Sequence, residues 1–251
     1  MAGILRVDQI QSTGGSNVID VSSGTFKIWD GNSYEAFTVS GALLSINTYT
    51  SQNGTWNSKS TSGGSGVWSK PSGCSHVLVY ATGGGGGARL NDNAYRGAGG
   101  GGGATAIRYI DVSNVSSVNY TYGGGGGYAR NSGRGSTGGT SSFGSYVTAT
   151  GGQGGQSDNP HQGGPGGNAS GGDINLPGGG GEMCHGTNRE GGGGSSFWHQ
   201  AGSSHHYYNN QEEITHGQWG SGGGYGYYSQ NSFAHNNCNG GAGCVIVYNY
   251  T

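Results

Sequence analysis

Hydrophobic and polar positions alternate in short blocks over the first fifty residues. The blocks are ILRV, NVIDV, TFKIWD, EAFTV and LLSIN, separated by Gly, Asn and Ser. Alternation over a few residues between turn-forming residues is typical of short strands, and no sustained helical periodicity appears. Strands this short bury too little apolar surface to fold alone. Residues 1–50 are therefore predicted to form a β region that partner chains complete.

The pattern changes after a polar stretch, residues 51–66, which is typical of a linker. A continuous apolar run, Val77–Tyr80, leads directly into glycine, and a matching run, Val245–Tyr248, follows glycine near the other end. Continuous apolar runs are typical of strands buried on both faces. We expect these two strands to be neighbours that close residues 67–251 as one domain. Further strands are predicted in AIRYIDV, SSVNYTY and SYVTATGG.

Glycine occupies 61 of the 251 positions, in runs such as 83–87, 99–103 and 123–127. Glycine in regular structure costs roughly 0.5–1 kcal/mol more than alanine, because more backbone freedom is lost. Such a chain stays disordered unless glycine allows something that other residues do not. Aromatic residues, at 10%, favour order. Polyglycine can form extended threefold helices whose N–H groups bond close neighbours on several sides. We therefore predict an all-β fold of β-strands and polyglycine II-like helices.

Composition excludes several classes of protein. Triplets such as GGQ and GGP are not sustained and only four prolines occur, which excludes collagen. A net charge of −2 with 9% charged residues gives no sign of the positively charged surface that binds nucleic acid or an anionic membrane. The sequence shows neither an apolar run long enough to span a bilayer nor a secretory leader. We expect no nucleic-acid partner and no membrane insertion.

Segments between the glycine runs are rich in Tyr, Trp, His, Asn, Ser and Arg. This composition is typical of recognition loops, in which rigid aromatic rings supply contact area and small polar groups supply hydrogen bonds. Packing between loops or at a chain interface is the alternative role for these aromatic residues. The candidate binding residues are Tyr95, Arg96, Trp198, His199, His205, His206, Tyr207, Tyr208, Asn209, Trp219, Tyr225, Tyr227 and Tyr228.

Four blocks appear in order between Val67 and Tyr250: VWSKPSGCSHVLVYATGGGGGA, GGTSSFGSYVTATGGQGG, GGDINLPGGGG and GGAGCVIVYNY. With these blocks the chain resembles the glycine-rich tip domain of bacteriophage tail fibres and adhesins. The N-terminal GILRVDQIQSTGGSNVI is similar to the start of short fibre proteins of marine and cyanobacterial phages.

The resemblance implies a homotrimeric fibre on the virion, assembled in the host cytoplasm. Its N-terminal part, residues 1–50, would attach to a tail component or form a shaft. Its distal loops would bind a saccharide or an outer-membrane protein on the bacterial surface. Those loops vary within the family, so the resemblance assigns no binding residue by position.

Motifs for cofactors and metals are weak. GRGSTG, residues 133–138, fits a dinucleotide fingerprint, but a strand pattern follows where that site needs a helix. The His- and Cys-containing segments lack C-x-x-C and H-E-x-x-H spacing. We expect no cofactor, no bound metal and free thiols. The alternative is a metal site formed by histidines of three chains on a trimer axis. The residues concerned are Cys184, His185, His199, His205, His206, His216, His235, Cys238 and Cys244.

Catalytic carboxylates are the remaining candidates for chemistry. Glycosidases need two carboxyl groups about 5–10 Å apart, which can come from distant positions or different chains. The candidates are Asp158, Asp173, Glu182, Glu190, Glu212 and Glu213. Because acidic residues are few, we expect no enzyme activity, and the resemblance then implies a receptor-binding protein. The alternatives are a virion-associated polysaccharide-degrading enzyme and a glycine-rich extracellular structural protein, although the latter should show near-periodic repeats.

Overall fold

A computed structural model describes the chain in two compact units, residues 1–42 with Thr251 and residues 43–250. The first forms an antiparallel sheet in the order β1-β2-β3-β4, made of strands of three or four residues. These are β1 (Gln9–Gln11), β2 (Asn17–Asp20), β3 (Lys27–Trp29) and β4 (Tyr34–Ala36). The structure describes these four strands and residues 41–52, 61–91, 96–130, 133–156, 162–183, 191–200, 217–224 and 238–251.

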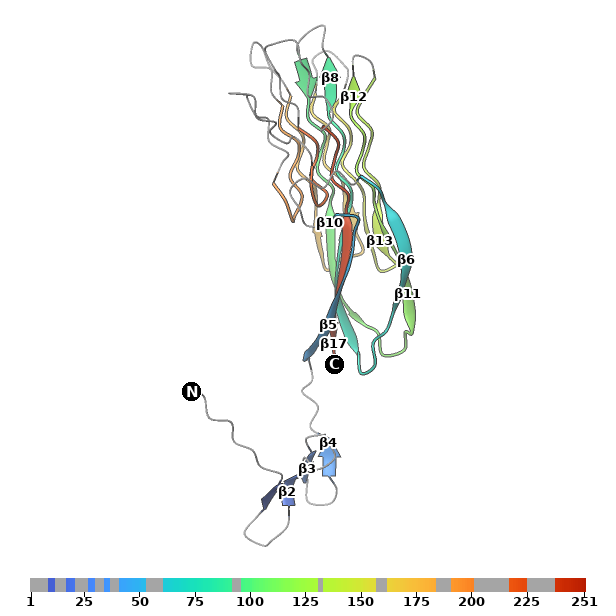
Figure 1. Cartoon of the computed structure of the whole chain (residues 1–251), viewed down its shortest axis with the longest axis vertical. Coiled ribbons are helices and arrows are strands. Elements are labelled where there is room, and N and C mark those ends of the chain that lie inside the picture. Colours follow the sequence, from blue (N-terminus) through green and yellow to red (C-terminus); the bar gives the residue numbers. More distant parts are fainter. Residues whose placement is uncertain are drawn as a thin grey trace, which may run out of the picture. The chain divides into compact units, whose positions relative to one another are not determined.

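The second unit contains two five-stranded antiparallel sheets that pack face to face (Figure 1). The first sheet has the order β16-β10-β7-β17-β5, with strands β16 (Ile174–Leu176), β10 (Thr105–Asp111), β7 (His76–Thr82), β17 (Cys244–Tyr250) and β5 (Leu43–Tyr49). The second sheet has the order β15-β14-β13-β11-β6, with strands β15 (Ala169–Ser170), β14 (Val147–Ala149), β13 (Ser141–Phe143), β11 (Ser117–Tyr122) and β6 (Gly64–Ser69).

The predicted all-β class is confirmed, since the described residues contain strands, turns and extended segments and no α-, 3₁₀- or π-helix. The two continuous apolar runs are neighbours, as expected: β7 pairs with β17, and Val79 lies opposite Val247. The pairing of β7 with β17 therefore closes the glycine-rich region between them as one unit.

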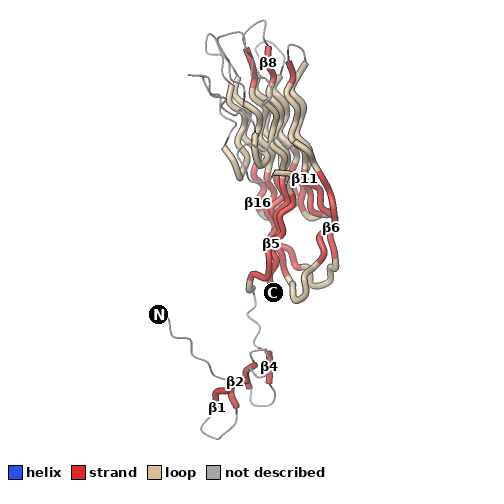
Figure 2. Tube along the Cα trace, in the orientation of Figure 1, coloured by secondary structure: helices blue, strands red, loops and turns tan. Residues whose placement is uncertain are grey.

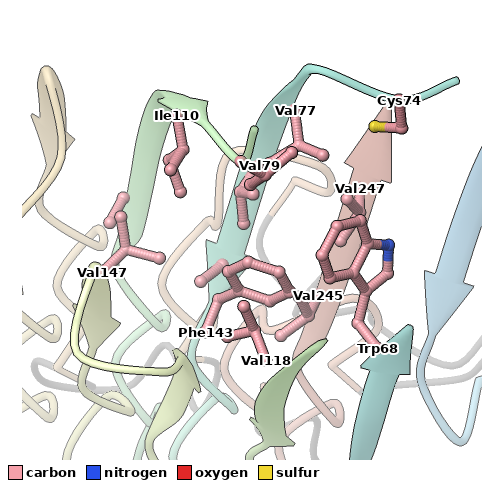
Figure 3. Packing of buried hydrophobic residues seen from close by; sticks show 13 residues of the cluster. Trp68, Cys74, Val77, Val79, Ile110, Val118, Phe143, Val147, Val245 and Val247 are labelled. Carbon is pink, nitrogen blue, oxygen red and sulfur yellow. The ribbon is translucent and has the colours of Figure 1, made fainter. Parts of the chain in front are cut away.

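The core between the sheets is small and aliphatic around two aromatic rings (Figure 3). Trp68 and Phe143 meet edge to face, with ring centroids 5.7 Å apart. The Trp68 indole Nε1 donates to Oδ1 of the fully buried Asn249 at 3.1 Å. The Asn249 amide nitrogen in turn donates to Ser45 and Asn47 on β5. Each polar group of this buried cluster thus has a partner, which removes the cost of its burial.

The division between the units falls earlier than the sequence pattern places it. LLSIN, assigned above to the N-terminal region, becomes β5 and pairs with β17. Tyr49 on this strand stacks on Tyr120 of the second sheet, with ring centroids 3.8 Å apart. β6 begins at Gly64, inside the stretch expected to be a linker. Short alternating strands look alike in sequence, so the pattern does not reveal which sheet each one joins.

Beyond the sandwich, the glycine runs continue as extended segments that lie side by side, drawn as tan tubes in Figure 2. In the run that follows β7, the N–H groups of Gly83 and Gly86 both donate to one neighbouring run. The two N–H groups after each of them donate to a second and a third neighbour. Hydrogen bonds that return to the same neighbour every three residues indicate a threefold polyglycine helix. The three neighbours are 99–104, 136–139 and 238–241.

The carbonyl groups of run 83–88 accept hydrogen bonds from three further segments, so six segments surround it. Run 99–104 is likewise bonded on six sides. We call this array of bonded runs the glycine lattice. The three further neighbours of run 83–88 are 126–129, 152–155 and 223. All six neighbours of run 99–104 are 83–86, 150–153, 164–167, 179–182, 194 and 220–223.

Only glycine fits at the centre of this lattice. A Cβ atom added to Gly84, Gly86 or Gly101 would collide with a carbonyl group of an adjacent run. At the periphery every third residue has a side chain, and Gln153 and Pro165 point outward and are exposed. The GGQ and GGP triplets therefore reflect a threefold helix with one face to solvent, although the chain is not a collagen.

Candidate functional site

The two ends of the glycine lattice differ. One end joins the sandwich, because strands such as β7 and β10 run directly into or out of glycine runs. The other, which we call the distal end, carries a three-stranded sheet in the order β12-β8-β9 (Figure 1). Its strands are β8 (Arg89–Asn91), β9 (Arg96–Ala98) and β12 (Ala129–Arg130). Ala98 also forms a bridge with Met183.

Hydrogen bonds join segments that are far apart in sequence at the distal end. Ala88 donates to Cys238, Gly155 to Gly87 and Gly99 to Glu182. These bonded residues belong to runs that lead to the distal end or return from it. At this end the chain passes from an outgoing run to a returning run five times, between residues 91 and 96, 130 and 133, 156 and 162, 183 and 191, and 224 and 238. The lattice therefore brings the ends of five intervening segments onto one rigid platform.

Arginine is the basic residue of the distal end, since all lysines lie at or before Lys70. The Arg89 side chain is buried, and its Nε donates to the Gly133 carbonyl at 2.9 Å. Arg130 and Arg134 are exposed beside it. Guanidinium groups present planar, permanently charged donors to hydroxyl, carboxylate or phosphate oxygens. These three arginines are not among the binding residues predicted from the sequence. The available signal was that Arg takes the place of Lys throughout the chain after Lys70.

Of the predicted binding residues, Arg96 lies at the distal end, in β9. Trp198 lies at the opposite end, where the lattice meets the first sheet. Its indole Nε1 donates to Thr82 Oγ1 at 2.9 Å, and its ring packs against Tyr80 with centroids 5.3 Å apart. These contacts give Trp198 a structural role at the junction.

His199 and Trp219 also lie at this junction. The His199 Nδ1 lies 2.7 Å from the Gln200 carbonyl oxygen and 3.4 Å from Ser221 Oγ. Trp219 has φ +47° and Gly220 has φ +83°, and Ser221 N donates across the turn to the Gln218 carbonyl at 2.9 Å. Two successive residues of positive φ closed by this bond make a type I′ turn. Trp219 thus shapes a reversal of the chain beside the sandwich.

The other predicted binding residues lie outside the described residues. They are Tyr95, His205, His206, Tyr207, Tyr208, Asn209, Tyr225, Tyr227 and Tyr228. Cys184, His185, His216 and His235 of the candidate metal ligands also lie outside, as do the carboxylates Asp158, Glu190, Glu212 and Glu213.

The described part of the chain brings no three His, Cys, Asp or Glu side chains together as a metal site. Cys74, Cys238 and Cys244 are buried free thiols. Burial raises the pKa of the Cys244 thiol to about 12, which keeps it protonated and unreactive. Asp173 Oδ2 accepts the Tyr109 N–H at 2.9 Å, as is typical of a structural carboxylate. Within the same residues, no helix has the length and apolarity needed to cross a bilayer.

The glycine-rich region matches a known protein family. The family described as "Glycine-rich domain" matches residues 59–250. A search of curated proteins finds no significant match. The family match spans the sandwich from β6 to β17 and every glycine run described above. The chain therefore belongs to the glycine-rich domain family.

Proposed function

We propose that the chain is a bacteriophage tail fibre protein that binds a receptor on the bacterial surface. The observation that supports this proposal most is the gathering of five intervening segments at the distal end of a backbone-bonded lattice. A rigid support lowers the entropy lost when the segments it carries bind a ligand. The order of the four sequence blocks between Val67 and Tyr250 is the second support.

The receptor in this proposal is a surface saccharide or an outer-membrane protein. Tyr95, Tyr225, Tyr227 and Tyr228 belong to segments that begin and end at the distal end. Their rings offer flat apolar faces, on which the C–H faces of sugars can stack. Arg130 and Arg134 place exposed, positively charged side chains at the same end. As part of the proposal, the fibre is a homotrimer on the virion, held to a tail component by its N-terminal residues.

The contacts of the described carboxylates favour binding over catalysis. Asp111, Asp173 and Glu182 each accept a hydrogen bond from a backbone N–H group. The hydrogen bonds of Asp111 with Ser113 lower the pKa of this carboxyl group. Carboxylates held in this way stabilise loops and strand edges. A catalytic general acid instead needs a raised pKa.

Adsorption to cells tests the proposal. Residues 225–237 are replaced by a Gly-Ser segment of equal length, and binding is measured on a bacterial strain that the unmodified protein labels. We expect at least a tenfold loss of binding. The control is the same replacement of residues 53–60, between β5 and β6, which should leave binding unchanged.

Two results would contradict the proposal. One is unchanged adsorption when residues 184–190 and 225–237 are both replaced. The other is release of oligosaccharides from the surface polysaccharide of that strain by the purified protein, which would favour the polysaccharide-degrading alternative.

A further inference from the structure

The outward faces of the two sheets have opposite character. On the second sheet, Ser117, Asn119 and Thr121 of β11 point to solvent, while Val118 between them is buried. Val67 on β6 is an isolated exposed apolar side chain among these polar residues. An antiparallel sheet with one polar face is suited to water on that side. This sheet therefore needs no cover on its outer face.

The outward face of the first sheet is apolar. Its pairing register places Tyr109, Leu78, Tyr248 and Ile46 side by side across four neighbouring strands. Val79 and Val247, the next residues along β7 and β17, are fully buried in the core, so the row points away from it. We call this outward surface, which includes Tyr80 and Ile174, the apolar face.

Phe197 and Trp198 pack on Tyr80 where the apolar face meets the lattice, and the described residues leave the rest of the face uncovered. Ile46 is 50% exposed, Tyr109 51% and Ile174 53%. The continuous apolar runs of β7 and β17 are typical of strands buried on both faces, yet the second sheet covers only one. Large exposed apolar patches on a soluble protein mark contact surfaces. The four side chains of the row are uncharged, and Asp111, two residues beyond Tyr109 on β10, places an exposed carboxylate at the end of the same face.

We propose that the apolar face packs against the same face of other copies of this chain, three in all. The proposal rests on the homotrimer of the proposed function and assigns its contact surface. β5, which carries Ile46, begins at Leu43, directly after the N-terminal unit ends at Ala42. Because the described strands of that unit have only three or four residues, we expect it to need partner chains to bury a core. Copies joined there hold their β5 strands at high effective concentration.

The width of the sheet fits three copies. Five strands about 4.8 Å apart make a face about 19 Å wide. Three such faces in a triangle lie about 5.5 Å from the common axis, close to half of the roughly 10 Å that separates packed sheets. Aromatic and aliphatic side chains of this length fill that space. In this arrangement the β5 edge of one copy meets the β16 edge of the next.

Mass measurement on the full-length chain tests the contact surface. Ile46→Asp and Tyr109→Asp introduce charge at half-exposed positions of the apolar face, and Val67→Asp, at a position 58% exposed, is the matched control on the second sheet. By light scattering we expect a three-chain mass for the unmodified protein and for Val67→Asp. Each variant of the apolar face should dissociate at a concentration at least about a hundredfold higher than the control.

If the N-terminal unit alone holds the copies together, the charged variants keep their mass. Crosslinking then tests the same apolar face. The double variant Ile46→Cys with Ile174→Cys should give covalent trimers on oxidation, whereas Val67→Cys should give none. A monomeric or dimeric unmodified protein, or crosslinking by Val67→Cys alone, overturns the proposal. A trimer crosslinked through the apolar face that binds no cells would overturn the receptor assignment and leave this surface in place.

Discussion

The backbone N–H of Gly86 donates to the carbonyl oxygen of Gly101 at 2.8 Å. The bond joins the two runs that have neighbours on six sides, so backbone groups alone hold this part of the molecule together. A net hydrogen bond contributes about 0.5–1.5 kcal/mol, and close Cα–H···O contacts add to it. A lattice of such bonds offsets the entropy that glycine loses on folding.

Alanine substitution within the lattice should depend on the space around each glycine. A Cβ atom on Gly86 would collide with the Gln153 carbonyl, whereas the nearest atom to a Cβ on Gly180 is a carbonyl oxygen 3.9 Å away. We expect Gly86→Ala to lower the free energy of unfolding by at least about 3 kcal/mol and Gly180→Ala to change it by less than about 1 kcal/mol. Chemical unfolding measures both. Equal effects would mean that the runs are loosely packed.

The buried amide of Asn249 should be costly to remove. Asn249→Ala leaves the Trp68 N–H and the oxygens of Ser45 and Asn47 without their partner. We expect a loss of about 2–4 kcal/mol in the free energy of unfolding. Asn119→Ala, on the polar face of the second sheet, should cost less than about 0.5 kcal/mol. A small effect at Asn249 would indicate that water replaces the amide.

The Cys244 thiol should make stability fall at alkaline pH. Burial raises its pKa from 9.0 to about 12, so the thiol ionises in the unfolded chain at a lower pH than in the folded chain. Its contribution is complete below pH 9 and is lost as the pH rises towards 12. Between pH of about 8 and 10.5 the unmodified protein should lose about 2 kcal/mol more stability than Cys244→Ala.

Thiol chemistry checks the same residue by another route. In the folded protein at a pH of about 8, Cys244 should resist alkylation by iodoacetamide until the chain is unfolded, because little thiolate is present. Rapid alkylation of Cys244 in the native protein would show that the junction between lattice and sheet is open.

Trp198→Phe separates packing from receptor binding at this junction. The substitution keeps an aromatic ring beside Tyr80 but removes the hydrogen bond to Thr82. We expect a loss of about 1 kcal/mol in the free energy of unfolding with unchanged adsorption to cells. The reverse result, lost adsorption at full stability, would return Trp198 to the binding surface.

The sequence predicts those parts of the fold that arise from strong local patterns. The apolar runs of β7 and β17 identify a central pair of strands, and uninterrupted glycine indicates close backbone packing. Strands such as β6 (GSGVWS) and β16 (INL) were missed, because Gly, Ser and Asn give no periodic signal. Their place is set by partners far along the chain.

The candidate site is less predictable for a related reason. Aromatic composition shows that intervening segments can bind, but it does not show at which end of the lattice each residue lies. The partner of Trp198 is 116 residues away in sequence, and Arg89 reaches Gly133 across 44. The hydrogen bonds between runs, which recur every three residues, determine at which end of the lattice each residue lies.

Amide hydrogen exchange of the central glycine runs tests the lattice most directly. If each N–H of Gly83–Gly87 and Gly99–Gly103 is bonded inside a lattice, these amides should exchange only on global unfolding, as slowly as those of β7 and β17. Exchange of these glycines within seconds at neutral pH, while the sandwich strands stay protected, would contradict the account.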